Sequence, residues 1–176
     1  RSGGMKMEIR RERACDHQEV YKLIQASFSG AEHADGNEQD LVQALRKSSA
    51  FLPELSLVAV DDNRIIGHIL FTEVRINSTV QLALAPLSVL PGYQRRGVGQ
   101  ALMREGHKLA AQMGYEFSVV LGSSGYYPKA GYVPADVYGI EPPFDVPREN
   151  FMALSLQGEA EPLHGMVMYA PELFSV

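Results

Sequence analysis

The sequence predicts an α/β (α+β) fold in which a mixed, mostly antiparallel central sheet is flanked by helices. Hydrophobic residues make up 45% of the 176 positions and charged residues 21%, which is typical of a globular chain. Apolar residues alternate with period two from about residue 55 to 90, and the period changes to 3.6 after Pro91-Gly92. A further apolar run follows this helix, and strands joined by a helical crossover lie parallel. The chain therefore combines an antiparallel meander with one parallel strand pair.

The N-terminal third predicts one strand and two helices. Residues 7–10 form the strand, and Asp16 with Glu19 has the spacing of a capping box that starts a helix. Apolar residues then recur at helical spacing as far as Phe28. The small and polar residues 29–36 predict a loop, and Asn37 is positioned to cap a second helix.

The remaining elements follow from the same two periods. Strands are predicted at 55–60, 64–76, 79–90 and 116–122, a helix at 98–113 that ends at Gly114, a short helix at 124–129, and late strands at 151–156 and 165–170. The predicted order is β-α-α-β-β-β-α-β-α-β-β. We expect Arg1 to Gly4, which precede Met5, to be a cloning remnant, and residues 5–176 to form a single domain.

Charge and cysteine content restrict the function. Sixteen Lys and Arg against 21 Asp and Glu give a formal charge of −5, which disfavours nucleic-acid binding because phosphate neutralisation needs a basic surface. No apolar run is long enough to suggest a membrane partner. Cys15 is the only cysteine, so no internal disulfide can form, and we expect a cytoplasmic location. A homodimer is compatible with these properties.

The segment 87–102 carries the clearest chemical pattern, because it reads as a strand, a tight loop with Gly97 and Gly99, and a helix start. The first N–H groups of a helix lack partners and favour anions, so this geometry suits a phosphate. The glycines permit close approach of the anion, and Arg95 and Arg96 add positive charge. Alternatively, the glycines serve only the turn and the arginines are solvated. A P-loop ending and the G-x-G-x-x-G spacing of a dinucleotide site are both absent.

Two blocks of residues make the pattern more specific. Gln94-Arg95-Arg96-Gly97-Val98-Gly99 resembles the Q/R-x-x-G-x-G/A pyrophosphate loop of the GNAT superfamily of N-acetyltransferases, and residues 126–132 resemble its Y-x-x-x-G-F/Y segment. The resemblance implies the GNAT fold, with splayed parallel strands, and acetyl-CoA as co-substrate. It implies that the pyrophosphate binds the backbone of Arg95 to Gln100 and that the pantetheine arm follows Leu87 to Val89. The implied cofactor contacts are Leu87, Ser88, Val89, Gln94, Arg95, Arg96, Gly97, Val98, Gly99, Gln100, Ser124 and Tyr127.

Pro86 fits this arrangement, because a proline interrupts a sheet ladder where the parallel strands are expected to separate. An ordinary edge or bulge proline is the alternative. Ser123-Ser124 stands where relatives often carry an acidic residue or asparagine, which leaves one local cofactor contact open.

Acetyl transfer to an amine needs a neutral amine, a polarised carbonyl and a proton for the departing thiolate. Tyr127, four residues before Gly131, stands where the resemblance places a general-acid tyrosine; Tyr126 is the competing choice, and simple packing is the alternative for both. The N–H of Val89 is the expected donor to the carbonyl. Glu73 lies in phase with Ile69 and Phe71 and is our candidate base, against the alternative of a solvated strand end.

The acceptor site is less defined. Acidic and histidine side chains in the 29–36 loop and the following helix start would attract a cationic amine or merely cap and solvate the helix; they are Glu32, His33, Asp35 and Glu38. The five histidines are scattered without ligand spacing, so we expect no metal. We therefore predict an acetyl-CoA-dependent N-acetyltransferase that transfers the acetyl group directly to a primary amine in a ternary complex, since no cysteine lies in either block. The acceptor is a small amine, an antibiotic-like amine or a protein amine. A non-catalytic acyl-CoA sensor and a peptide-binding module at the sheet edge are the alternatives.

Overall fold

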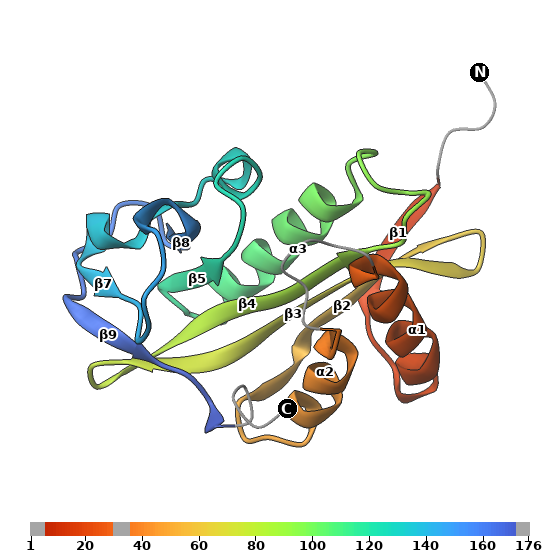
Figure 1. The fold of residues 1–176 in the computed structure, drawn as a ribbon, viewed down its shortest axis with the longest axis horizontal. Helices are drawn as coiled ribbons and strands as arrows, with labels where there is room; N and C mark the ends of the chain where they lie inside the picture. The colour runs from red at the N-terminus through yellow and green to blue at the C-terminus, as the bar shows by residue number, and fades with distance from the viewer. Residues whose placement is uncertain (1–5, 30–35, 172–176) are drawn as a thin grey trace.

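The computed structural model describes residues 6–29 and 36–171, which form a twisted mixed sheet with helices on both faces (Figure 1). The helices are α1 (His17–Phe28), α2 (Glu38–Arg46) and α3 (Val98–Gln112). The strands are β1 (Met7–Arg11), β2 (Phe51–Asp61), β3 (Arg64–Ile76), β4 (Thr79–Val89), β5 (Phe117–Leu121), β6 (Val133–Pro134), β7 (Ile140–Glu141), β8 (Phe151–Ser155) and β9 (Gly165–Met168). The predicted fold class is confirmed.

The sheet runs in the order β1-β2-β3-β4-β5-β8-β6, with β9 beside the end of β3 and β7 beside β9. β2 to β4 form the predicted antiparallel meander, and β1 pairs antiparallel with β2. β4 and β5 are parallel, as the helical crossover requires, but they pair only at Leu82↔Ser118 and Ala83↔Val119. Beyond Ala83, β4 continues without pairing to β5, so its backbone edge is open on that side.

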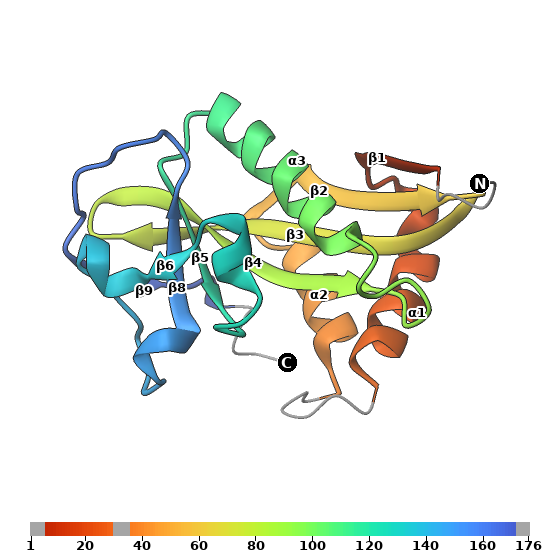
Figure 2. The same ribbon diagram turned by 90° about the horizontal axis from the view of Figure 1, so that it is seen from above.

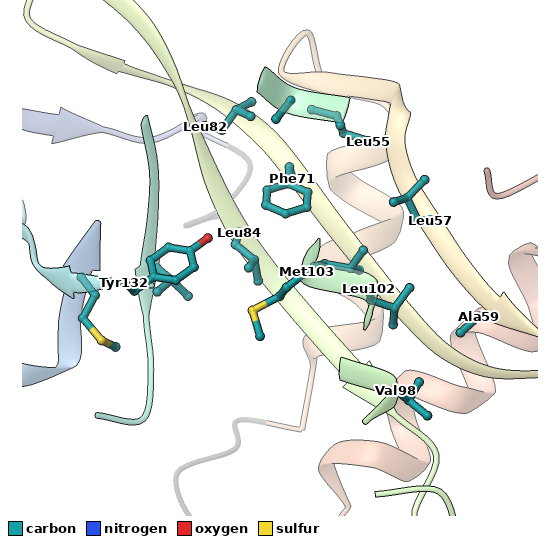
Figure 3. Packing of buried hydrophobic residues seen from close by; sticks show 14 of the residues in the cluster. Leu55, Leu57, Ala59, Phe71, Leu82, Leu84, Val98, Leu102, Met103 and Tyr132 are labelled. Carbon is teal, nitrogen blue, oxygen red and sulfur yellow. The ribbon is translucent and has the colours of Figure 1, made fainter. Parts of the chain in front are cut away.

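The alternation of side chains assigns the two faces of the sheet to different helices (Figure 2). On one face, α3 packs over β2 and β3 through a cluster that includes Phe71, Leu102 and Met103 (Figure 3). On the other face, α1 and α2 pack through a cluster that includes Ile24, Leu45 and Leu70. Both helix layers therefore fix the position of β3 and β4.

Three details differ from the sequence predictions at the helix starts. Asp16 and Glu19 do not form a capping box, because the Arg10 guanidinium (2.7 Å) and the Arg13 N–H (2.7 Å) bind the Asp16 carboxylate. Glu19 instead accepts the N–H of Ile65 at 2.9 Å and ties α1 to β3. The Asn37 side chain makes no capping hydrogen bond, since α2 begins with the Asn37 carbonyl accepting from Asp40 and Leu41.

The predicted helix at 124–129 is one turn of 3₁₀-helix, Tyr127–Ala130. Pro128 removes an N–H from this turn, and Gly131 ends it in the left-handed region at φ 103°. The two-residue strands β6 and β7 were not predicted, and β2 begins at Phe51 rather than Leu55.

Candidate active site

The turn between β4 and α3 forms an exposed concave backbone at the open end of β4. Gly97 has φ 84° and Arg95 φ 63°, so two left-handed residues bend the chain sharply before the helix begins. Ala101 is the residue whose N–H bonds the Gly97 carbonyl (3.0 Å), which leaves the N–H groups of the first turn directed outward. No heavy atom lies within 4 Å of the position that a Cβ on Gly97 would take. The geometry is that of an anion site.

The side chains of this turn stabilise it in different ways. Gln94 Nε2 donates to the carbonyl of Val89, the last residue of β4, at 3.1 Å. The Arg96 guanidinium lies 5.0 Å from the centroid of the Tyr93 ring, in cation–π contact. Arg95 and Arg96 are both exposed, so they add positive charge at the rim of the turn.

β4 is irregular just before the segment that faces this turn. Ile69 of β3 pairs with Leu87, whereas Phe71 pairs with Leu84, so β4 carries one extra residue at Ala85-Pro86. Pro86 therefore lies at a bulge, directly after the point where pairing with β5 ends. The side chains of Leu87 and Val89 pack toward α3. The backbone of this stretch lies at the open edge of the sheet, because pairing with β5 ends at Ala83.

Two adjacent tyrosines follow β5, and they contact different glycines. The Tyr126 hydroxyl lies against Gly99, so closely that a methyl group on Gly99 would overlap it. The Tyr127 ring packs on Gly122, with the rings of Tyr126 and Tyr132 at centroid distances of 5.1 Å and 5.8 Å. Burial raises the pKa of Tyr127, and its hydroxyl makes no hydrogen bond with the described residues.

Glu73 lies elsewhere on the sheet. It has the predicted phase with Phe71, but its carboxylate accepts the hydroxyl of Tyr115 at 2.5 Å, near the C-terminal end of α3. Glu73 pairs with Leu82, before the strands separate, and lies four residues from Ile69, or about 13 Å along the strand. The structure therefore does not bring Glu73 to the Leu87–Val89 segment.

The structure describes only some of the other predicted site residues. Ser124 is exposed in the loop between β5 and Tyr127, where Ser123 Oγ accepts the N–H of Gly125 at 3.1 Å. Glu38 is in the first turn of α2. Glu32, His33 and Asp35 fall outside the described residues, as does the predicted cloning remnant.

Sequence reasoning missed a buried polar cluster beneath α1 and α2. It comprises Glu12, Arg46, Ser56, His68 and Ser88, which come from β2, β3, β4, α2 and the turn after β1. One signal was present in the sequence: His68 interrupts the apolar run of residues 65–71. Its partners are distant in the chain, so only the fold brings them together.

Comparison with known proteins agrees with this geometry. The model of the acetyltransferase (GNAT) family matches residues 17–132, which include β4, the turn, α3 and both tyrosines. The uncharacterized N-acetyltransferase YjhQ of Escherichia coli is 37% identical over 141 residues, covering 76% of this chain and 78% of that protein. The chain belongs to the acetyltransferase (GNAT) family.

Solved GNAT structures extend the similarity to almost the whole chain. A GNAT acetyltransferase of Brucella melitensis, in complex with acetyl-CoA, superposes with a TM-score of 0.79 at 32% identity, over 94% of this chain and 97% of the other. YhbS of Escherichia coli, in complex with CoA, gives a TM-score of 0.86 at 25% identity, over 100% and 96%. The family resemblance of the two sequence blocks is thus confirmed.

Across residues 6–29 and 36–171, no three His, Cys, Asp or Glu side chains gather as metal ligands. None of the helices in these ranges has the length and apolarity needed to cross a membrane.

Proposed function

We propose that this GNAT protein transfers the acetyl group of acetyl-CoA to a primary amine, directly and within a ternary complex. The observation that supports this most strongly is the anion-binding turn at the start of α3, placed beside the unpaired edge of β4. A pyrophosphate and an extended pantetheine arm need these two features side by side. The solved relatives that bind CoA or acetyl-CoA share the fold over nearly the whole chain.

The residues present fit the cofactor. The pyrophosphate binds the outward N–H groups between Arg95 and Gln100, where Gly97 leaves open space, whereas Gly99 is buried with the Tyr126 hydroxyl against it. The pantetheine amides pair with the backbone of Leu87, Ser88 and Val89, as a further strand would. Gln94 and Val98 hold the turn and the helix start, and Ser124 and Tyr127 flank the arm from the β5 side.

Tyr127 donates the proton that the departing thiolate needs. A hydroxyl without a partner is available to donate, and burial raises the pKa of Tyr127, so the group stays protonated at neutral pH. The Val89 N–H donates to the thioester carbonyl and stabilises its developing negative charge. The acceptor amine attacks the carbonyl carbon, the C–S bond breaks, and the thiolate takes the tyrosine proton. The nitrogen releases one proton as it becomes an amide, and the Tyr127 hydroxyl regains one from solvent.

The test combines turnover with two matched variants. Purified protein is assayed for CoA release from acetyl-CoA with four primary amines: ethanolamine, tyramine, spermidine and a peptide with a free N-terminus. Tyr127→Phe should keep acetyl-CoA affinity and lower the single-turnover rate about 10²- to 10⁴-fold, since it loses one general acid. Tyr126→Phe is the control for a neighbouring tyrosine that touches Gly99 instead.

Other outcomes assign the function differently. Loss of rate in Tyr126→Phe alone transfers the acid role to Tyr126. Full rates in both variants leave water as the proton donor. Acetyl-CoA binding without transfer to any amine supports an acyl-CoA sensor and overturns the enzymatic proposal.

A further inference from the structure

The buried cluster under α1 and α2 is centred on the Glu12 carboxylate, whose side chain is 2% exposed. Arg46 from α2 binds both carboxylate oxygens, with Nε–Oε1 3.2 Å and Nη2–Oε2 2.6 Å. Ser56 Oγ of β2 donates to Oε1 at 2.8 Å. His68 Nε2 of β3 lies 3.2 Å from the same Ser56 Oγ. A chain of hydrogen bonds thus runs from the ion pair to a fully buried imidazole.

This chain determines the tautomer of His68. Burial alone would raise the pKa of Glu12, but the hydrogen bond from Arg46 and the proximity of His68 lower it, so Glu12 is an ionised acceptor. Ser56 has one hydroxyl proton, and it donates this proton in the hydrogen bond to the Glu12 carboxylate. Ser56 Oγ must therefore accept from His68, which requires the proton on Nε2. His68 Nδ1 then carries the free lone pair.

A second polar group without a hydrogen-bond partner belongs to the residue directly opposite His68 on β4. Ser88 of β4 is the direct register partner of His68, and both residues are 0% exposed. His68 Nδ1 and Ser88 Oγ are buried, and neither has a hydrogen-bond partner in the described structure. Directly opposed residues of antiparallel strands have Cβ atoms about 4.5–5.5 Å apart, a gap that a change of the Ser88 side-chain rotamer or one water spans.

The strand alternation shows that both side chains face α1. A Cβ on Gly67 would lie 2.8 Å from Val98 Cγ1 of α3, so Gly67 faces α3 and the next residue, His68, faces the opposite side. Ser88 shares that side as its pair partner, while its neighbours Leu87 and Val89 pack toward α3. Ser88 is therefore the residue that faces α1 in the segment proposed to hold the pantetheine arm.

We propose that the hydroxyl of Ser88 and the imidazole of His68 form the path that removes a proton from the acceptor amine, with Ser56, Glu12 and Arg46 positioning His68. This inference rests on the proposed function and supplies the base that Glu73 is not placed to provide. The amine nitrogen gives its proton to Ser88 Oγ as Ser88 passes its own proton to His68 Nδ1. The nitrogen lone pair forms the C–N bond. After product leaves, His68 returns the proton to solvent by the same route.

The charges around His68 suit a transient proton. Glu12 Oε2 lies 3.9 Å from His68 Nε2 and stabilises the imidazolium, whereas Arg46 from α2 and His17 from α1 oppose it. His17 Nε2 lies 3.9 Å from Glu12 Oε1 and is the more exposed of the two histidines. Burial lowers the pKa of His68 to about 4, so the resting imidazole is neutral and able to accept. The competing interpretation is that the cluster only anchors α2 to the sheet.

The first experiment measures the tautomer in the intact protein. Long-range ¹H–¹⁵N correlation spectra at pH 7 should show His68 protonated on Nε2, with the shift of a lone-pair nitrogen on Nδ1. The His68→Gln variant assigns the signal, because Gln retains a donor toward Ser56 and lacks Nδ1. A proton on Nδ1 overturns the proposal, whatever the activity.

The second experiment separates proton removal from structural support. Ser88→Ala and His68→Gln should lower the single-turnover rate with the best amine of the panel about 10²-fold at pH 7 with unchanged KM for acetyl-CoA. The loss should shrink as pH approaches the amine pKa, because solution then supplies neutral amine. Thr72→Val removes another buried hydroxyl from the same face of β3 and should match wild type throughout.

The outcomes distinguish the two proposals. A loss that is constant with pH, or equal in Thr72→Val, identifies the cluster as structural and overturns this inference. Wild-type rates in Ser88→Ala overturn this inference and leave the proposed function intact. Absence of amine acetylation in the wild type overturns the proposed function, and the proton path with it.

Discussion

Gly99→Ala tests the cofactor loop with a single methyl group. The added Cβ would overlap the Tyr126 hydroxyl, and it would stand 3.5 Å from Leu87 Cδ2. Moving the end of the half-buried Tyr126 side chain costs about 0.5–1.5 kcal/mol, whereas replacing glycine inside a helix gains about 0.5–1 kcal/mol. The free energy of unfolding should therefore stay within about 1 kcal/mol of wild type.

The same methyl group should weaken acetyl-CoA binding strongly. It would displace the Tyr126 hydroxyl from Gly99 in the first turn of α3, next to the N–H groups that the pyrophosphate is proposed to approach. One hydrogen bond to a charged group contributes about 1.5–3 kcal/mol, so losing one lowers affinity roughly 10- to 150-fold. Titration calorimetry gives the affinity, and urea denaturation gives the stability.

Gly106→Ala in the same helix provides the matched control. Its Cβ would overlap the Phe71 ring in the core, so it should destabilise the fold by about 1–3 kcal/mol and leave affinity unchanged. The double variant Gly99→Ala/Tyr126→Phe shows whether the displaced hydroxyl or the methyl group blocks the cofactor. Wild-type affinity in folded Gly99→Ala would refute the placement of the pyrophosphate at this turn.

Three further predictions follow from other parts of the structure. Replacing Arg95 and Arg96 together by Ala should weaken acetyl-CoA binding only modestly and flatten its salt dependence, because an exposed ion pair contributes at most about 1 kcal/mol; complete loss in calorimetry would contradict this. Gly97→Ala should destabilise the fold by about 1–2 kcal/mol in urea, since φ is 84°, and an unchanged midpoint would contradict the strain. Burial lowers the pKa of His107 to about 4, so the unfolded chain takes up a proton near pH 6.5 that the folded protein refuses until about pH 4. The free energy of unfolding should therefore fall as the pH is lowered from about 6.5 to about 4. Urea midpoints should fall less with pH in His107→Gln than in wild type, and equal slopes of midpoint against pH in the two proteins would contradict this prediction.

Much of the fold was predictable because local patterns determine it. The period of two through β3 and β4, and the period of 3.6 through α3, reflect burial of one face of each element. The parallel pairing of β5 follows from the crossover alone. The failures concern groups whose partners are distant: the Asp16 carboxylate binds Arg10 rather than a helix N–H, and Glu19 binds the N–H of Ile65, 46 residues away. No local spacing encodes those contacts.

The candidate site, too, was predictable from the sequence only where its chemistry is local. The turn proposed to bind the pyrophosphate was visible in the sequence because its chemistry is that of consecutive backbone N–H groups, which require glycine at fixed positions. For Glu73, period two predicted the face of β3 but not the position along it, and the sheet register places it beside Leu82. The sequence favoured Tyr127 over Tyr126 by its distance from Gly131, and the structure adds that Tyr126 lies against Gly99 while Tyr127 packs on Gly122.

Strand β4 joins the proposed cofactor site to the buried polar cluster around His68. Its backbone edge is free toward β5 after Ala83, and its two faces alternate between α3 and α1. Leu87 and Val89 therefore fasten the strand to the α3 core, while Ser88 between them reaches the buried cluster on the other side. A ligand that pairs with the edge of this strand is thus next to a hydroxyl backed by His68, without any side chain leaving the core. The bulge at Ala85-Pro86 sets this phase, because it lets Leu84 and Leu87, which are three residues apart, both face α3 opposite Phe71 and Ile69. Regular pairing at unchanged length would place Leu87 opposite His68 and turn Ser88 toward α3, since a shift of one residue exchanges the two faces of a strand. Deleting one of the two bulge residues should instead restore regular alternation and keep Ser88 opposite His68.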